Sequence, residues 1–321
     1  MGKYEKQGAK CGFYIACDII QTIRIWVVLM NFFSTTVFYI LEVLKWLILA
    51  RVLVSWLPMA GLQISRFYPA IQWLYRLTDP ILLPLRPFSR VGMMDLSPII
   101  AFFIISFLQN LTRGAGSTIK QTIALAVVLV VAFSVHEFSH ALVAYRLGDS
   151  TAKNAGRLTL DPRRHLDVLG SIMVLAVGFG WAKPVPVNPY NLRNGPKAGM
   201  AIVAAAGPMS NLLLALLAAV PVKLGVIDPI FYSAYLPNPT ELFSFFIYLN
   251  VVLVFFNLLP IAPLDGFRVL AGFLPYPTAT TFLKLEPFGP LILLLLIFLG
   301  GPVFTGLIIG PTNTVVGWLL S

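Results

Sequence analysis

Charged side chains are scarce in this sequence. Asp, Glu, Lys and Arg make up 11% of its 321 residues, while hydrophobic types make up 58%. An ordinary soluble domain has about 25% charged residues, so this composition excludes a water-soluble fold and places the chain in a lipid bilayer. The 24 prolines and 24 glycines argue for broken helices and re-entrant loops besides plain membrane spans. We therefore expect an all-α polytopic membrane protein.

Cysteine is nearly absent as well. Cys11 and Cys17, the only two, match neither a CxxC pair nor a zinc ribbon, so we interpret them as packing residues. The sequence also lacks a basic patch interleaved with aromatic residues, as RNA binders carry. The net charge of +10 comes from basic residues in short loops between apolar segments, which is the positive-inside pattern of membrane topology. We expect the lipid bilayer as a partner, and no nucleic acid.

Two of the three histidines form an HExxH motif at the inner end of an apolar helix. His136 and His140 stand one helical turn apart on one face and can grip one metal ion. Glu137, roughly 100° around the helix, can reach a metal-bound water as general base. The preceding residues 122–135 carry no charge, and ionisable groups deep in a bilayer are costly and functional by default. The motif predicts a hydrolytic centre inside the membrane, with one Zn²⁺ per chain.

A catalytic zinc needs a third protein ligand and an open position for water. His165 is the remaining histidine, but it lies in a polar loop rich in turn formers, where a solvated histidine is the ordinary interpretation. Asp265 is the better candidate, because it follows a charge-free apolar helix that Pro260 and Pro263 must break. A helix-capping aspartate at the membrane interface is the alternative.

The chain is predicted to contain two membrane blocks. Residues 1–34 form an N-terminal segment, either interfacial or an extra span, and residues 35–113 form the first block, with a helix ending near Leu57 and another at 97–111. The segments 44–58 (LKWLILARVLVSWLP) and 74–87 (LYRLTDPILLPLRP) resemble the YggT family of small bacterial membrane proteins. That resemblance supplies little mechanism.

The second block covers residues 120–321. We expect the motif helix at 121–146 and two further spans at 198–222 and 241–260, each near the roughly 20 residues needed to cross. The apolar stretch 287–320 is broken by glycines and prolines, and forms either one span with a re-entrant turn or two short spans. The basic segment 146–197 is expected in the cytoplasm.

Several motifs of the second block resemble the site-2 protease family of intramembrane zinc metalloproteases. They are FSVHEFSHA at 133–141, GRLTLDP at 156–162, GPMSN at 207–211 and NLLPIAPLDG at 257–266. The resemblance implies zinc on His136, His140 and Asp265, with Glu137 as the base. The chain resembles a minimal member, without a PDZ insertion or a CBS domain.

An intramembrane protease must first extend its helical substrate, and an exposed strand edge can do this by pairing with it. The segment that contains Gly178, Phe179 and Gly180 resembles the family's membrane re-entrant β-loop, although a structural turn is the alternative. Asn211, just after Gly207-Pro208, could donate to the developing oxyanion or could satisfy carbonyls that Pro208 frees. Asn257 is a second candidate for holding the substrate.

The expected function is hydrolysis of peptide bonds within or near the transmembrane segment of a single-span membrane protein, as part of regulated intramembrane proteolysis. The resemblance places the protein in the bacterial plasma membrane, with the active site toward the cytoplasm. Two alternatives stay open. A metal-handling membrane protein would need further acidic or histidine residues along a path across the bilayer, and an idle scaffold would have no need of Glu137.

Overall fold

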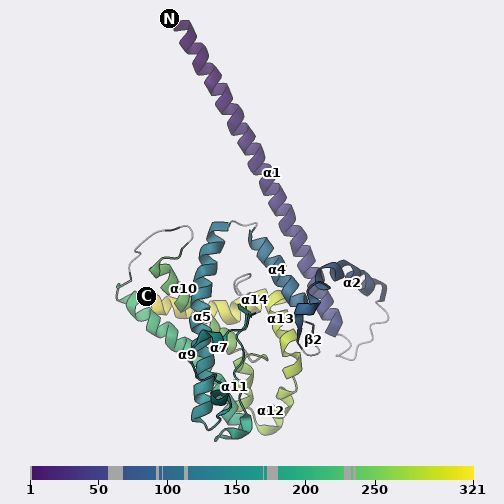
Figure 1. Cartoon of the computed structure of the whole chain (residues 1–321), viewed down its shortest axis with the longest axis vertical. Coiled ribbons are helices and arrows are strands. Elements are labelled where there is room, and N and C mark those ends of the chain that lie inside the picture. Colours follow the sequence, from purple (N-terminus) through teal and green to yellow (C-terminus); the bar gives the residue numbers. More distant parts are fainter. Residues whose placement is uncertain are drawn as a thin grey trace. The chain divides into compact units, whose positions relative to one another are not determined.

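The computed structural model describes residues 2–56, 68–91, 94–95, 97–111, 115–168, 170–171, 180–227, 233 and 236–321. The prediction of an all-α polytopic membrane protein is confirmed, because helices dominate the chain and four of the described helices are long and apolar enough to cross a membrane. The chain divides into two compact units, Met1–Ala115 and Gly116–Ser321. Figure 1 shows the elements of both.

The described part of the first unit consists of helices and two short paired strands. The strands β1 (Arg90–Val91) and β2 (Met94–Asp95) pair antiparallel, with Arg90 opposite Asp95. The helices are α1 (Gly2–Trp56), α2 (Tyr68–Leu82), α3 (Arg86–Ser89) and α4 (Ser97–Leu111). Ile48, Leu82, Ala101 and Ile105 form its buried cluster, which joins α1, α2 and α4.

Helix α1 runs without a break across residue 34, the predicted boundary between the N-terminal segment and the first block. The physical reason is visible in the sequence, since residues 13–57 contain neither glycine nor proline and nothing there breaks a helix. The predicted helix at 97–111 has the bounds of α4.

The second unit holds the remaining elements. Its helices are α5 (Ala115–Arg146), α6 (Thr151–Asn154), α7 (Pro162–His165), α9 (Gly195–Lys223), α10 (Pro239–Asn257), α11 (Asp265–Phe273), α12 (Tyr276–Leu283), α13 (Gly289–Leu299), α14 (Gly301–Phe304) and α15 (Gly310–Leu320), with 3₁₀ turns η3 (Pro189–Asn191) and η4 (Glu286–Phe288) and a π-helical turn η5 (Thr305–Ile309).

Small side chains hold the spanning helices of this unit together. The span-length helices are α5 from Lys120, α9, α10 and Gly301–Leu320. Ala215, Ala218 and Ala219 of α9 pack against α10 and α15 in the largest buried cluster. Alanines let helix backbones approach closely in a membrane, where lipid offers no hydrophobic drive to association. The C-terminal stretch thus contains one span-length helix, preceded by the shorter α13, and the break lies at Gly300.

The loops between α5 and α9 place residues 180–188, which we call the strip, beside the motif helix. Ala182 forms an isolated antiparallel bridge with Leu166, and the Lys183 N–H donates to the His165 carbonyl at 2.7 Å. Residues 183–188 belong to no helix or strand, and Asn188 itself has extended backbone dihedrals. Gly180 begins the described part of this strip, while Gly178 and Phe179 lie outside the described residues.

Candidate metal centre

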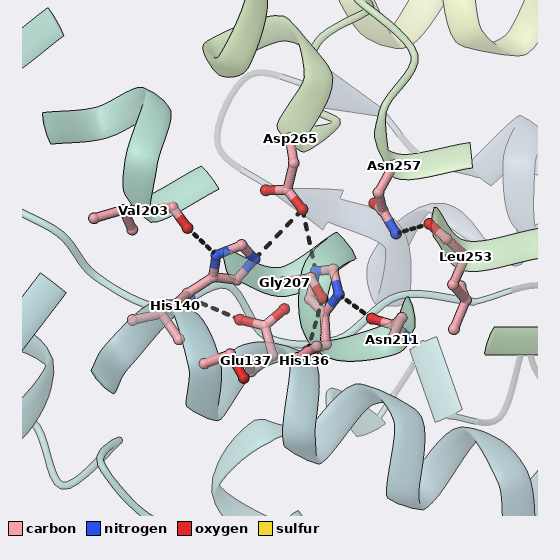
Figure 2. A network of polar contacts seen from close by, with 12 residues as sticks. His136, Glu137, His140, Val203, Gly207, Asn211, Leu253, Asn257 and Asp265 are labelled. Atoms are coloured by element: carbon pink, nitrogen blue, oxygen red, sulfur yellow. Dashed lines mark hydrogen bonds and ion pairs between the residues drawn. The ribbon is translucent and has the colours of Figure 1, made fainter. Parts of the chain in front are cut away.

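The two motif histidines project from one face of α5 into the interior of the second unit. Their rings stand edge to face, with centroids 4.6 Å apart and planes at 84°. His136 is 7% exposed and His140 is 8% exposed. This is the placement that i and i+4 spacing predicts. Figure 2 shows both rings turned toward Asp265.

Each imidazole is held through its Nδ1 atom. His140 Nδ1 lies 2.7 Å from the Val203 carbonyl oxygen, and His136 Nδ1 lies 2.6 Å from Asn211 Oδ1, both on α9. Because a carbonyl oxygen only accepts hydrogen bonds, Nδ1 of His140 carries the ring proton. The same tautomer allows His136 Nδ1 to donate to Asn211 Oδ1. Each Nε2 then presents a lone pair, which is the form that binds metal.

Asp265 meets these lone pairs from the other side. Its Oδ2 lies 3.2 Å from His136 Nε2 and 3.4 Å from His140 Nε2, and it is buried with no hydrogen-bond partner among the described residues. Helix α10 ends at Asn257, and the proline-rich turn brings the chain back so that α11 begins at Asp265. Gly266 permits this turn, because a Cβ there would lie 2.1 Å from the Leu258 carbonyl oxygen.

The three atoms fit a zinc ion. The two Nε2 atoms and the carboxylate oxygen lie within 4.8 Å of one another. Tetrahedral ligands at about 2.0–2.1 Å from zinc stand roughly 3.3 Å apart, which matches both contacts of Asp265. Positive charge placed among three electron-rich atoms that face one another is electrostatically favourable, since their lone pairs repel.

Gly207 of α9 forms the wall beside this space. A Cβ at Gly207 would lie 2.4 Å from His140 Nε2 and 2.5 Å from His136 Nε2, so any side chain would occupy the position of the ion. The absence of a side chain at this residue therefore keeps the metal position open. The sequence motif Gly207-Pro208 marked this residue without revealing why glycine is needed there.

Glu137 faces the strip. Its Oε2 accepts a hydrogen bond of 3.2 Å from the Val185 N–H. Arg157, which is 6% exposed, donates to the Pro184 carbonyl at 3.3 Å and also to the Lys183 carbonyl. The strip thus connects a buried arginine with the carboxylate of the HExxH motif. Burial lowers the pKa of Arg157, and the Glu137 carboxylate opposes that shift.

The remaining predicted site residues are placed as follows. Asn211 is fully buried, with its carboxamide turned to His136 and Asn250. Asn257 donates from Nδ2 to the Leu253 carbonyl one turn back, at 3.0 Å (Figure 2). Their substrate-binding roles, like that of Gly180, stay predictions. His165 is fully buried, and its Nε2 lies 2.6 Å from the Thr159 carbonyl oxygen, so it is not the solvated histidine expected.

Sequence reasoning missed four participants in the site. They are Arg157, Val185, the Val203 carbonyl and Asn250. Two of them carried a usable signal, because Arg157 stands in the GRLTLDP motif and Asn250 is a polar residue in the middle of an apolar span. The backbone groups of Val185 and Val203 leave no trace in a sequence.

Comparison with known proteins finds a family match in each unit. Residues 30–115 match the family described as CCB3/YggT, and residues 223–299, which include Asp265, match Peptidase family M50. The chain is 42% identical over 173 residues to the Bacillus subtilis protein named "Putative zinc metalloprotease YwhC", covering 54% of this chain and 78% of that protein. It is 33% identical over 221 residues to "Putative zinc metalloprotease Rip2" of Mycobacterium tuberculosis, covering 64% and 79%. No solved structure matches significantly.

The span-length helices and the buried His–His–Asp group define an integral membrane protein of the metallopeptidase class. The chain belongs to the site-2 protease family, peptidase family M50, and carries a YggT-family unit on its N-terminal side.

Proposed function

We propose that the protein is an intramembrane zinc endopeptidase that cuts single-span membrane proteins within or near their transmembrane segments. The observation that carries this proposal is the convergence of His136 Nε2, His140 Nε2 and Asp265 Oδ2 beside Glu137. Both histidines lie on α5, which is long enough to span a membrane, and Asp265 begins the short helix α11. The names of the bacterial relatives support zinc as the metal. The three ligands would hold one Zn²⁺ per chain.

Zinc bound there would supply Lewis acidity, polarising the scissile carbonyl and lowering the pKa of a water ligand to about 7. Glu137 would take the proton of the attacking water and pass it to the leaving amine nitrogen. The Val185 N–H restrains one carboxylate oxygen of Glu137 and leaves the other for this transfer. Both proton transfers can use one carboxylate, since it is neutralised in the first step and regenerated in the second.

Burial of the site supports a substrate that is itself in the membrane. Both histidines are below 10% exposed, and the span around them is apolar. His140 lies six residues before the end of α5 at Arg146, about 9 Å at 1.5 Å per residue, so water needs only a short path from that end. Eight of the 23 basic residues lie in 146–197. By the positive-inside pattern this end faces the cytoplasm, and we place the protein in the bacterial plasma membrane.

Regulated intramembrane proteolysis is the process that such an enzyme serves, with release of a soluble fragment into the cytoplasm. The metal-handling alternative is disfavoured, because the described residues contain one group of three metal-ligating side chains and a transport path needs a succession of them. The scaffold alternative leaves the placement of Glu137 beside the ligand atoms without a purpose.

The test is cleavage of a co-expressed single-span reporter by wild type, Glu137→Gln and Glu286→Gln. Loss of a general base costs about 10²–10⁴-fold in rate, so Glu137→Gln should abolish detectable product while retaining zinc. Glu286 is an exposed residue paired with Arg268, and its substitution should leave cleavage unchanged. Cleavage by Glu137→Gln at the wild-type rate would refute the assignment.

A further inference from the structure

A chain of buried hydrogen bonds leads from His136 away from the metal centre. His136 Nδ1 and Asn211 Oδ1 are 2.6 Å apart, Asn211 Nδ2 donates to Asn250 Oδ1 at 3.0 Å, and Asn250 Nδ2 donates to the Phe246 carbonyl at 2.9 Å. We call these groups the asparagine relay. The relay joins α5, α9 and α10, and both asparagines are completely buried.

The Phe246 carbonyl fixes the direction of the whole relay. This oxygen can only accept, so the amide group of Asn250 must face it and the Asn250 oxygen must face Asn211. The Asn211 amide nitrogen then points to Asn250, and the Asn211 oxygen points to His136. Since that oxygen also only accepts, the proton of the His136 ring must sit on Nδ1. Nε2 is left with a free lone pair toward Asp265.

The two histidines thus reach the same tautomer by different means. His140 is bonded directly to the Val203 carbonyl, which cannot reverse its role. His136 is bonded to a carboxamide, which could rotate by 180° and present its amide group instead. In that orientation the proton would move to Nε2, and the ring could no longer bind a metal ion. Asn250 prevents this rotation, because it accepts from the Asn211 amide.

We propose that Asn250 is a positioning residue for the metal site, which sets the metal-binding tautomer of His136 through Asn211. The proposal rests on the proposed function only in that zinc occupies the His–His–Asp group. Partners of a metal-binding histidine typically change metal affinity 10–100-fold when they are removed. Asn250 would do so without touching either His136 or the ion.

A purely structural role makes a different prediction. A hydrogen bond between Asn211 and Asn250 would also hold α9 against α10, as polar side chains do in membrane proteins. Its loss would then lower thermal stability and leave zinc affinity unchanged. If instead Asn211 donates to the oxyanion of the substrate, Asn250 substitutions would change kcat and not zinc affinity. Zinc affinity therefore separates the proposed role from the other two, and thermal stability and kcat separate those two from each other.

The experiment measures the zinc dissociation constant of the purified full chain in detergent, by competition with a chromophoric chelator. Asn250→Leu removes the acceptor and should weaken zinc binding about 10-fold or more. Asn250→Asp keeps an oxygen toward Asn211 and, as the neutral acid, a donor toward Phe246, so it should retain wild-type affinity. Ser134→Ala, which removes a buried polar group of α5 outside the relay, is the matched control.

A double-mutant comparison completes the test. In an Asn211→Leu background the relay is already broken, so Asn250→Leu should cause no further loss of zinc affinity. Equal losses in both backgrounds would overturn the proposal, as would unchanged affinity in Asn250→Leu alone. These outcomes require only that wild type binds zinc. A wild type that binds no zinc refutes the proposed function itself, and a wild type that binds zinc without cleaving leaves the relay fully testable.

Discussion

The backbone N–H of Val185 donates to the Glu137 carboxylate, with 3.2 Å between nitrogen and Oε2. The strip that carries Val185 is held by Arg157 at the two preceding carbonyls and by the bridge between Leu166 and Ala182. The carboxylate of the HExxH motif is thereby oriented by a loop about 50 residues further along the chain.

Val185→Pro should lower kcat without removing zinc. Proline lacks the N–H that restrains Glu137, and a residue that precedes proline, as Val185 precedes Pro186, is restricted to the β and polyproline II regions, the second of which proline adopts. A misplaced catalytic group can cost up to about 10²-fold, so we expect a decrease of roughly 10- to 100-fold. Arg157→Gln should act in the same direction by loosening the strip, whereas Arg163→Gln at an exposed position should not. Unchanged kcat in Val185→Pro would show that this hydrogen bond has no role in the reaction.

Gly207→Ala should weaken zinc binding. The new methyl group would lie within 2.5 Å of both Nε2 atoms unless α9 moves away. Measured zinc content after dialysis should fall well below that of wild type. Gly317→Ala is the control, since a Cβ at Gly317 meets nothing within 4 Å. Full zinc content in Gly207→Ala would mean that α9 does not pack closely against the metal position.

Asp149 should stabilise the loop after α5. Its carboxylate is fully buried and accepts hydrogen bonds from Thr151, Asn188 and Asn191. Burial alone would raise the pKa of Asp149, but these donors outweigh it and hold the pKa below its ordinary value. Asp149→Asn should lower the unfolding temperature, since a buried donor without a partner costs about 1–3 kcal/mol.

The pH dependence of this effect follows from the lowered pKa. A group with a depressed folded-state pKa stabilises the protein above its ordinary pKa, about 3.9, and loses that contribution as the pH falls through the folded value. The difference between wild type and Asp149→Asn should therefore be full at pH 7 and shrink below about pH 4. A difference that shrinks between pH 7 and 5 would contradict the assignment.

A buried arginine links α1 and α2 in the first unit. Arg51 Nη1 lies 2.7 Å from Asp79 Oδ1 and 2.6 Å from Thr78 Oγ1, and the guanidinium stacks 4.2 Å from the centre of the Tyr75 ring. The two YggT-like segments therefore contact each other through this ion pair. Removing one partner of a buried pair costs about 3–5 kcal/mol, and the partial exposure of Asp79 favours the lower end for Asp79→Ala. In an Arg51→Leu background, Asp79→Ala should lower the free energy of unfolding much less, as measured by thermal unfolding. Equal costs would show that the pair does not stabilise the unit.

The sequence predicted that His136, His140 and Asp265 would lie together, and the structure groups them. Two histidines at i and i+4 share a helix face, and an aspartate after a proline-broken apolar helix has few other reasons to be there. The orientation of those ligands could not be predicted. It depends on which carbonyl of α9 faces His140 and on how α10 packs against α9, and tertiary packing decides both.

Helix boundaries could likewise be predicted only where a local sequence signal marks them. The bounds of α4 were predicted because Ser97-Pro98 begins it clearly. Helix α5 begins at Ala115, six residues before the predicted start, because 115–120 contains no helix breaker except Gly116. The path of the chain from α6 to the strip at 180–188 has no periodic pattern, and the contact of Val185 with Glu137 could be known only from the structure.

The central claim is that His136, His140 and Asp265 bind one zinc ion. The most direct test is the zinc content per chain of purified wild type and Asp265→Ala, measured by elemental analysis, with Asp161→Ala as a control at an exposed helix cap. We expect about one zinc in wild type and in the control, and close to none in Asp265→Ala. Full zinc content in Asp265→Ala, or none in wild type, would contradict the claim.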